Sequence, residues 1–266
     1  MTMFGQPQNS SDSHKLKLLS YNVQVGIPAN NFRHYLSNTW KHVLPFPGRR
    51  NNLDRIAHFI KEFDIVGLLE LDSGSIRSEF VHQPEYVAEK AGFPYCYSKT
   101  NRDMGILAQH SLAILSRHEA CYVREHKLPS TIPGRGALEV HFGCHADRDP
   151  LVVVLAHLSL MQKAQRKQIA YLSKLIKPHR HAVVMGDFNT QIHSQAFEQL
   201  FDDTGLSKPD KAQHTFPSWR PRLGFDHIFA TPEIKMGEAE VFGLDCSDHL
   251  PVGMEVGIPL HAIPSS

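Results

Sequence analysis

Two apolar segments that flank an amphipathic helix constrain the fold most strongly. Residues 151–156 (Leu-Val-Val-Val-Leu-Ala) form a continuous apolar run rich in valine, which is typical of a central strand covered on both faces. Apolar residues then recur at helical spacing from Ser159 until Pro178, and a second buried run follows at 181–185. Strands that alternate with helices in this way predict an α/β fold.

The same alternation extends along the chain. Residues 51–63 carry apolar positions on one helical face and lead directly into a buried strand at 65–69, which ends at Glu70. Further strands are predicted at 17–25, 111–116, 137–142, 225–230 and 250–256, with a short helix from the cap Ser194 to Leu200. Because there is no internal repeat or low-complexity block, we expect one α/β sandwich over residues 16–266, preceded by a disordered tail at 1–15.

Composition narrows the class of protein. The chain has 266 residues, of which 41% are hydrophobic, enough for a sizeable core. Its 28 basic and 27 acidic residues give a net charge of +1, which argues against a dominant electrostatic grip on long nucleic acid. No apolar run is long enough to span a membrane, and the N-terminus lacks a signal-peptide pattern. We expect a cytoplasmic monomer with no transmembrane segment and no stable protein partner.

The cysteines are far apart. The chain has no C-x-x-C pair among Cys96, Cys121, Cys144 and Cys246, and this spacing argues against a zinc ribbon. We predict that all four are reduced, partly buried thiols. The eighteen histidines slightly favour metal or proton-transfer chemistry.

Polar residues stand where the predicted strands begin or end. A rigid sheet would aim such side chains into the loops at its edge. Each one alone has an ordinary explanation, because Asp and Asn commonly form turns and a histidine in an apolar strand is usually a satisfied core residue. Their shared position in the topology is what favours a functional site. The residues are Asn22, Glu70, His157, Asp187, Asp226 and Asp248.

Several of these side chains are oxygen ligands of the kind that hard divalent cations prefer. Mg²⁺ takes only one or two carboxylates and keeps several waters, and Glu70 with Asn22 and Asp248 fits such a site. Asp187 can orient or deprotonate an attacking water, and Asn189 can hydrogen-bond the water or a phosphate. The pattern therefore predicts metal-assisted attack on a phosphoester.

Two histidines complete the predicted site. His157 and His249 can donate to phosphoryl oxygens or act as acid and base. A histidine used in this way needs a carboxylate on its other ring nitrogen, and we assign Asp226 to that place behind His249. The sequence has no evident Ser or Cys nucleophile motif, so we expect water to attack directly, without a covalent intermediate.

Six segments together resemble a known family. They resemble, in order, the motifs of the endonuclease/exonuclease/phosphatase (DNase I-like) superfamily, over about residues 16–256. The segments are Leu19-Ser20-Tyr21-Asn22, Leu68-Leu69-Glu70, Leu155-Ala156-His157, Gly186-Asp187-Phe188-Asn189, Phe225-Asp226-His227-Ile228 and Ser247-Asp248-His249.

The resemblance implies both a fold and an activity. The fold is a four-layer α/β sandwich with two central mixed β-sheets flanked by helices, and the activity is that of an Mg²⁺- or Mn²⁺-dependent phosphoesterase. By the same resemblance Glu70 is the principal metal ligand, Asp187 and Asn189 act on water and phosphate, and Asp226 pairs with His249.

The chain departs from the family pattern at two places. Leu69 stands where family members often have Gln before the metal-binding Glu. In the strand 111–117, Ser111 and Leu112 replace a Gly-Asn pair whose Asn lies near the substrate phosphate in nuclease-like members. The second change weakens the case for nucleic-acid cleavage without excluding it.

Candidates for substrate contact lie in loops. In residues 29–48, Trp40 and other apolar residues recur at nearly helical spacing and form either an apolar lip beside the site or plain packing. In residues 215–222, Trp219, Arg220 and Arg222 either contact the substrate or belong to a proline-stiffened hairpin. Arg135 is a further candidate.

Substrate identity stays open at this point. We place a phosphodiester, from nucleic acid or from a lipid or inositol phosphoester, ahead of a phosphomonoester. A non-catalytic binding module on the same fold is the remaining alternative, but such a protein should lack at least one motif residue, and none is missing.

Overall fold

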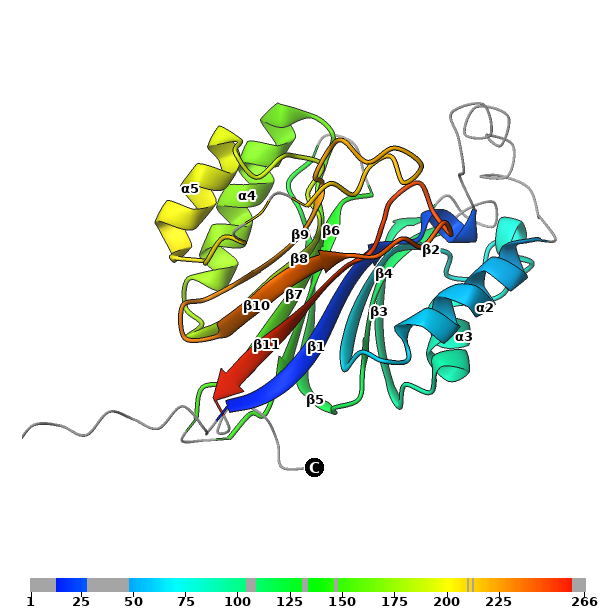
Figure 1. The fold of residues 1–266 in the computed structure, drawn as a ribbon, viewed down its shortest axis with the longest axis horizontal. Helices are drawn as coiled ribbons and strands as arrows, with labels where there is room; N and C mark the ends of the chain where they lie inside the picture. Colours follow the sequence, from blue (N-terminus) through cyan, green and yellow to red (C-terminus); the bar gives the residue numbers. More distant parts are fainter. Residues whose placement is uncertain are drawn as a thin grey trace, which may run out of the picture.

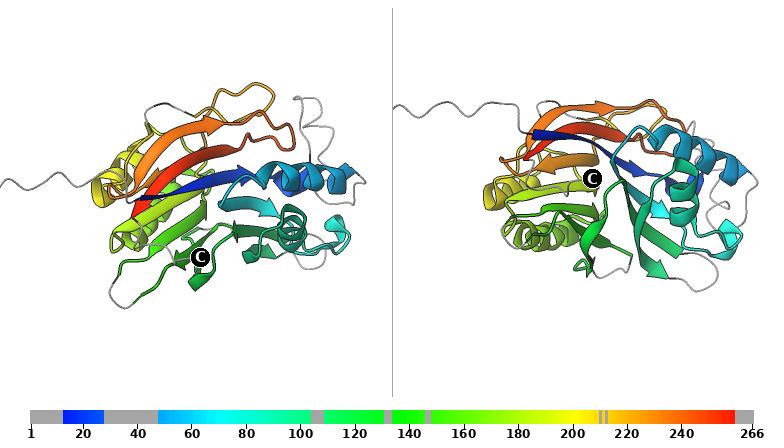
Figure 2. Two further views of the ribbon diagram at one scale, coloured as in Figure 1. Left: turned by 60° about the horizontal axis from the view of Figure 1, so that its bottom comes forward. Right: turned by 90° about the horizontal axis from the view of Figure 1, so that it is seen from below.

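Two β-sheets lie face to face at the centre of the computed structural model, and a pair of helices covers the outer face of each sheet (Figures 1 and 2). The structure describes residues 13–27, 48–103, 109–130, 134–145, 148–209, 211 and 213–259. The predicted four-layer α/β sandwich with two mixed sheets is confirmed.

The first sheet has the strand order β10-β11-β1-β2-β4-β3. Strands β1 and β2 run parallel and are joined through helix α2, whereas the other neighbours are antiparallel. The elements of this half are β1 (Ser13–Asn22), η1 (Gln24–Gly26), α2 (Gly48–Ile60), β2 (Ile65–Leu71), η3 (Ile76–Ser78), α3 (Gln83–Ala91), β3 (Tyr95–Asp103), β4 (Gln109–Ser116), β10 (Lys235–Val241) and β11 (Val252–Pro259).

The second sheet has the order β5-β6-β7-β8-β9 and, like the first, contains one parallel pair of strands joined through a helix. Strands β7 and β8 are parallel and are joined through α4, which packs beside α5. As predicted, Ser194 caps the short helix α5, and its Oγ accepts from the backbone N of Phe197. The elements are β5 (Ala120–Lys127), β6 (Gly136–Phe142), β7 (Leu151–His157), α4 (Gln162–Ile176), β8 (His181–Asp187), α5 (Gln195–Thr204) and β9 (Asp226–Ala230).

Three apolar layers hold the sandwich together. The largest lies between the sheets, and Gly67 lets them approach, because a Cβ there would lie 2.6 Å from Leu155 Cδ1 and 2.8 Å from Met185 Cε. The other two lie between each sheet and its helices. Strands β7 and β8 are both buried on their two faces, which is why their sequences are continuous apolar runs.

Among the α-helices and β-strands, the sequence did not predict α3, β3, β5 and β10. Strands β5 and β10 are edge strands whose side chains are mostly exposed, so they carry little apolar alternation. The first strand begins at Ser13, inside the predicted tail, of which residues 1–12 lie outside the described residues. The predicted lip at 29–48, including Trp40, also lies outside them except for Gly48.

The prediction that all four cysteines are reduced is wrong. Cys121 in β5 and Cys144 after β6 form a disulfide with a Cα–Cα distance of 5.9 Å, and only the antiparallel pairing of β5 with β6 brings them together. Cys96 and Cys246 are free thiols. Within the described part of the chain, no helix is both long and apolar enough to cross a membrane.

Candidate active site at the ends of the parallel strands

The two pairs of parallel strands bring the predicted site residues to one edge of the sandwich. In the first sheet Asn22 ends β1 beside Leu69 of β2, next to Glu70. In the second sheet His157 of β7 is the register partner of Asp187 of β8, and Asp187 is the partner of Asp226 in β9. In Figure 1 this edge is where the β1 and β2 arrows end, beneath the orange and red loops.

A β-bulge aims Glu70. The pairing of β2 with β4 shifts between Leu69 and Leu71, so Leu69 faces the layer between the sheets and Leu71 faces the helices. Glu70 has a φ of 58°, a left-handed conformation that non-glycine residues rarely adopt. Its side chain is 24% exposed and its Oε1 lies 3.6 Å from His157 Nε2. The strand therefore turns one carboxylate out of its apolar run.

Both oxygens of Asp187 are held by neighbours. Asn189 N donates to its Oδ1 at 2.9 Å, and Asn22 Nδ2 donates to its Oδ2 at 3.1 Å. The end of β8 and the turn after it require unusual backbone: Gly186 within the strand has a φ of 144°, and Asn189 in the turn has a φ of 49°. A Cβ on Gly186 would lie 1.9 Å from the carbonyl oxygen of Ala156, so only glycine fits there.

The structure brings Asp226 and His249 together as predicted. His249 Nδ1 lies 2.8 Å from Asp226 Oδ2, and Thr215 Oγ1 donates to the same oxygen at 2.6 Å. His249 Nε2 is left facing Asp187, 3.9 Å from its Oδ2. Thr215 was missed by the sequence analysis, because its contact with Asp226 arises only when the hairpin between them closes.

The pKa values of the two histidines are shifted in opposite directions. Burial lowers the pKa of His249, but the carboxylates of Asp226 and Asp187 outweigh burial and raise it well above the ordinary value. Burial and then Arg135 lower the pKa of His157 to about 3, although Glu70 opposes them. At neutral pH His249 is thus a cation, whereas His157 is a neutral imidazole and its contacts with Glu70 and Asp187 are not ion pairs.

The carboxylates of the site also differ in pKa. Burial raises the pKa of Asp187 to about 7, with His249 opposing and Asp226 adding to the rise. Burial likewise raises the pKa of Asp248 to about 6. Burial would raise the pKa of Glu70 too, but His157, which becomes protonated in the acid range where Glu70 titrates, lowers it together with His110 and His249 to about 2. Of these three carboxylates, Glu70 is therefore the one that is firmly ionised.

Gln24 links Asn22 to Asp248 and was not found from the sequence. Its backbone N donates to Asn22 Oδ1 at 3.1 Å and its Nε2 donates to Asp248 Oδ2 at 3.0 Å. Both polar atoms of the Asn22 side chain therefore have protein partners, and its role as a metal ligand stays a prediction. Gln24 Oε1 is buried and has no hydrogen-bond partner among the described residues.

These groups fit a hard divalent cation. The carboxylates of Glu70 and Asp248 and the unsatisfied Gln24 Oε1 are all oxygen donors, which Mg²⁺ and Mn²⁺ prefer. Three potential ligand atoms of Asp187, Asp226 and His249 also lie within 4.8 Å of one another. However, Asp226 and His249 already hydrogen-bond each other, which leaves the Glu70 side as the better candidate for a cation.

The predicted substrate-contact residues lie at different distances from this centre. Arg135 joins it directly: its Nη1 contacts both nitrogens of the His157 ring, 3.0 Å from Nδ1. Arg220 and Arg222 are exposed and Trp219 is half-buried in a hairpin beside the His249 loop. That hairpin is anchored by the backbone N of Ser218, which donates to the Asp248 carbonyl at 2.7 Å.

A polar hollow of about 450 Å³ adjoins Asn189. Its lining is mostly neutral amides and hydroxyls, and Gln165 Nε2 donates to the Asn189 carbonyl at 2.8 Å. The lining residues are Leu160, Gln162, Gln165, Asn189, Thr190, Gln191, His193, Ser194 and Phe225.

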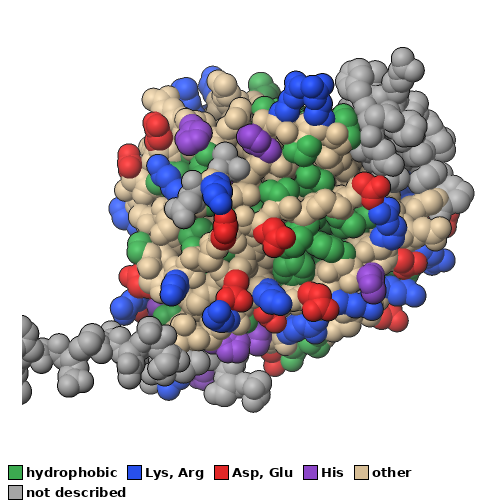
Figure 3. All heavy atoms as spheres, in the orientation of Figure 1, with side chains coloured by type: hydrophobic (Ala, Val, Ile, Leu, Met, Phe, Trp, Pro, Cys, Tyr) green, Lys and Arg blue, Asp and Glu red, His purple; other side chains and the backbone are tan. Residues whose placement is uncertain are grey.

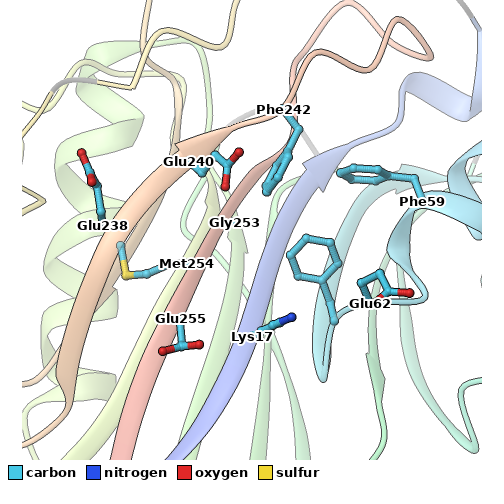
Figure 4. A pocket seen from close by; sticks show the side chains of 10 residues that line it. Lys17, Phe59, Glu62, Glu238, Glu240, Phe242, Gly253, Met254 and Glu255 are labelled. Carbon is cyan, nitrogen blue, oxygen red and sulfur yellow. The ribbon is translucent and has the colours of Figure 1, made fainter.

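A second hollow, of about 420 Å³, lies on another face between α2 and strands β1, β10 and β11 (Figure 4). Phe59, Phe63 and Phe242 pack against one another there, with glutamates around them. Figure 3 shows this face, where hydrophobic side chains gather among acidic ones. It contains none of the predicted site residues, so it is not the candidate active site.

Comparison with known proteins agrees with this geometry. Residues 19–249 match the endonuclease/exonuclease/phosphatase family, and the chain belongs to that family. No curated protein matches the chain.

Solved structures share the fold. An endonuclease/exonuclease/phosphatase from Beutenbergia cavernae is 20% identical, with a TM-score of 0.70, covering 92% of this chain and 72% of that one. A mannosyl-6-phosphatase from Bacteroides thetaiotaomicron is 20% identical, with a TM-score of 0.66 over 91% of this chain and 99% of its own. A humanized TDP2 from D. rerio is 16% identical, with a TM-score of 0.62 over 91% and 98%.

Proposed function

We propose that this chain is an Mg²⁺- or Mn²⁺-dependent phosphoesterase that hydrolyses a phosphodiester by direct attack of water. The observation that carries the proposal is the setting of Asp187. Its carboxylate is held by Asn22 and Asn189 and lies between a neutral His157, at 3.6 Å, and a cationic His249, at 3.9 Å. A base, a hydrogen-bond donor and a positive charge thus converge on one point.

The cation would be held by Glu70 and Asp248, with Gln24 Oε1 close to Asp248. When bound, such an ion neutralises charge on phosphoryl oxygens and makes water a better nucleophile. Glu70 suits this place because its pKa of about 2 keeps it ionised at every physiological pH.

The remaining groups divide the work on the water and the phosphate. Asp187, with a pKa near neutrality, accepts a proton from the attacking water, and Asn189 positions its carboxylate. The protonated Nε2 of His249 donates to a phosphoryl oxygen, while Asp226 fixes the ring through Nδ1. Neutral His157, braced by Arg135, donates a second hydrogen bond without adding charge.

The balance of charge favours a diester over a monoester. Among the described groups that line the centre, Arg135 is the one permanent cation, and His249 is already paired with Asp226. A diester carries one negative charge at neutral pH, whereas a monoester carries up to two. Trp219, Arg220 and Arg222 would contact the non-scissile part of the substrate, either nucleic acid or a lipid or inositol phosphoester.

One observation favours a second candidate, a phosphomonoester of a hydroxyl-rich molecule. The polar hollow beside Asn189 offers neutral amides and hydroxyls, which suit a sugar or polyol leaving group better than an apolar one. Of the similar structures, one bears the name of a mannosyl-6-phosphatase.

A paired assay separates these candidates. Turnover of bis-p-nitrophenyl phosphate and of p-nitrophenyl phosphate is measured with Mg²⁺, Mn²⁺ and EDTA, followed by a panel of abasic DNA, RNA, sphingomyelin, inositol phosphates and sugar phosphates. We expect EDTA-sensitive turnover with the diester ahead. A dominant monoester activity would overturn the diester assignment in favour of the second candidate.

The control variant is His249→Ala, in which diester turnover should disappear while the fold persists. Absence of metal-dependent turnover on the whole panel, combined with retained binding of one member, would instead point to a binding module. We also propose that the chain acts as a monomer without a stable protein partner, which light scattering of the purified protein tests.

A further inference from the structure

We propose that Glu139, His141 and His179 form a Zn²⁺ site, separate from the active site, on the outer face of the second sheet. Glu139 and His141 are two residues apart in β6, so they share a face of the sheet. His179 follows the C-terminus of α4 and reaches the same point. One potential ligand atom from each of the three lies within 4.8 Å of the others.

The distances fit a tetrahedral ion after a small adjustment. His141 Nε2 lies 2.7 Å and His179 Nε2 lies 3.5 Å from the same oxygen, Glu139 Oε1. Ligand atoms bound to zinc at about 2.0–2.1 Å stand about 3.4 Å apart in a tetrahedron. The His141–Glu139 pair has to open by less than about 1 Å, and the ligand nitrogens of His141 and His179 already lie within 4.8 Å of each other, so changes in side-chain torsion supply the adjustment.

A supporting pair of side chains fixes the carboxylate. His126 Nε2 lies 2.7 Å from the other oxygen, Glu139 Oε2, and its Nδ1 lies 2.9 Å from the hydroxyl of Tyr171 in α4. The hydrogen bonds from Tyr171 through His126 to Glu139 occupy only Oε2, so Oε1 is left for the metal. Outer hydrogen bonds that orient a ligating group in this way are a general feature of metal sites.

The number of histidines exceeds what the carboxylate needs. Glu139 is buried, so its charge requires one positive partner, and a single imidazolium would suffice. The rings of His141 and His179 have centroids 5.2 Å apart, close enough that two imidazolium charges would repel. An ion bound to their lone pairs neutralises Glu139 and uses both rings as neutral ligands.

The donor set selects the metal. Two imidazole nitrogens and one carboxylate oxygen are typical zinc ligands, whereas Mg²⁺ and Ca²⁺ favour all-oxygen sites. The side chains of His141 and His179 are 14% and 22% exposed, which leaves solvent access for a fourth ligand, water. A bound ion would tie strand β6 of the second sheet to the segment that follows α4.

The test measures zinc content in untagged protein. Wild type, Glu70→Gln and His141→Ala/His179→Ala are incubated with ZnCl₂ and excess MgCl₂, desalted, and analysed by mass spectrometry of the metal. Glu70→Gln removes a charged ligand from the active site but leaves the proposed zinc site intact. We expect about one zinc ion per chain in wild type and in Glu70→Gln, and loss of that ion in the double variant.

Two further variants keep the test decisive. His58→Ala/His118→Ala removes two histidines elsewhere and should retain zinc. Tyr171→Phe removes the supporting hydrogen bond and should weaken zinc binding about 10–100-fold without removing a ligand, which keeps the proposal testable if the double variant does not fold. Zinc that is absent from wild type, that disappears with Glu70→Gln, or that survives in a folded His141→Ala/His179→Ala variant would overturn the assignment.

Discussion

Two clusters of titratable side chains among the described residues differ in their ratio of carboxylates to imidazoles. At the strand ends, the three carboxylates of Glu70, Asp187 and Asp226 meet two imidazoles, those of His157 and His249. On the outer face of the second sheet, one carboxylate, Glu139, meets three imidazoles. Oxygen-rich and nitrogen-rich donor sets suit hard and borderline cations respectively, so one small domain offers two chemically distinct sites.

The clusters also differ in the backbone conformation of their residues. Around the active site, Gln24, Glu70 and Asn189 all have positive φ, and such strain is commonly found where a side chain must be aimed at a ligand. In the Glu139 cluster, Glu139 and His141 lie in strand β6 beside a disulfide, with no positive φ in the described part of β5 or β6. The difference indicates a reactive centre in one place and a structural one in the other.

The largest expected effect is loss of the proposed base. Asp187→Asn should lower kcat about 10²–10⁴-fold, because the amide cannot accept a proton from water. The melting temperature should change little or rise, since a buried carboxylate beside Asp226 is removed. Steady-state kinetics and thermal unfolding check both, and near-normal kcat would exclude Asp187 as the base.

The next largest effect is expected from removal of the Cys121–Cys144 disulfide, which lies beside the Glu139 cluster. Cys121→Ser/Cys144→Ser should destabilise the protein by about 2–4 kcal/mol, because the unfolded chain regains conformational freedom. Turnover at a temperature where the variant is still folded should stay close to that of wild type. A large loss of kcat in the folded variant would show that the two regions are coupled.

Gln24→Ala should have a smaller effect, confined to the active site. Without the amide, Asp248 loses a hydrogen bond at 3.0 Å and Asn22 keeps its contact with the backbone of residue 24. We expect activation by Mg²⁺ to require about tenfold more metal, as for other residues that orient ligands. The Mg²⁺ dependence of turnover provides the measurement, and an unchanged half-saturation would contradict the role given to Gln24.

The smallest effect concerns acid stability of zinc-free protein. Burial would raise the pKa of Glu139, but hydrogen bonds from His126, His141 and His179 lower it well below the ordinary value. Stabilisation from this depressed pKa is present above the unfolded value of about 4.3 and is lost as the pH falls below it.

Denaturant unfolding of wild type and Glu139→Gln at pH 7 and pH 3.5 measures this difference. The stability advantage of wild type should shrink at the lower pH. An advantage that is equal at both pH values would show that the charge of Glu139 contributes nothing.

Much of the active site follows from local sequence. A strand shows itself by a buried run, and Glu70, His157 and Asp187 each stand at the end of one. Parallel pairing carries such ends to a common edge, so their proximity follows once the strands are identified. Edge strands β5 and β10 lack this apolar signal because they bury little, and they were missed.

The sequence by itself determined the alternation of buried strands and helices and the residues at the strand ends, and its motifs suggested that Asp226 pairs with His249. Tertiary structure alone decided the Cys121–Cys144 bond, the contact of Gln24 with Asp248 and the meeting of three histidines on Glu139. The physical reason is that apolar periodicity records which face of each element is buried. Strand register and helix packing, which no short stretch of sequence encodes, set which side chains from separate elements touch.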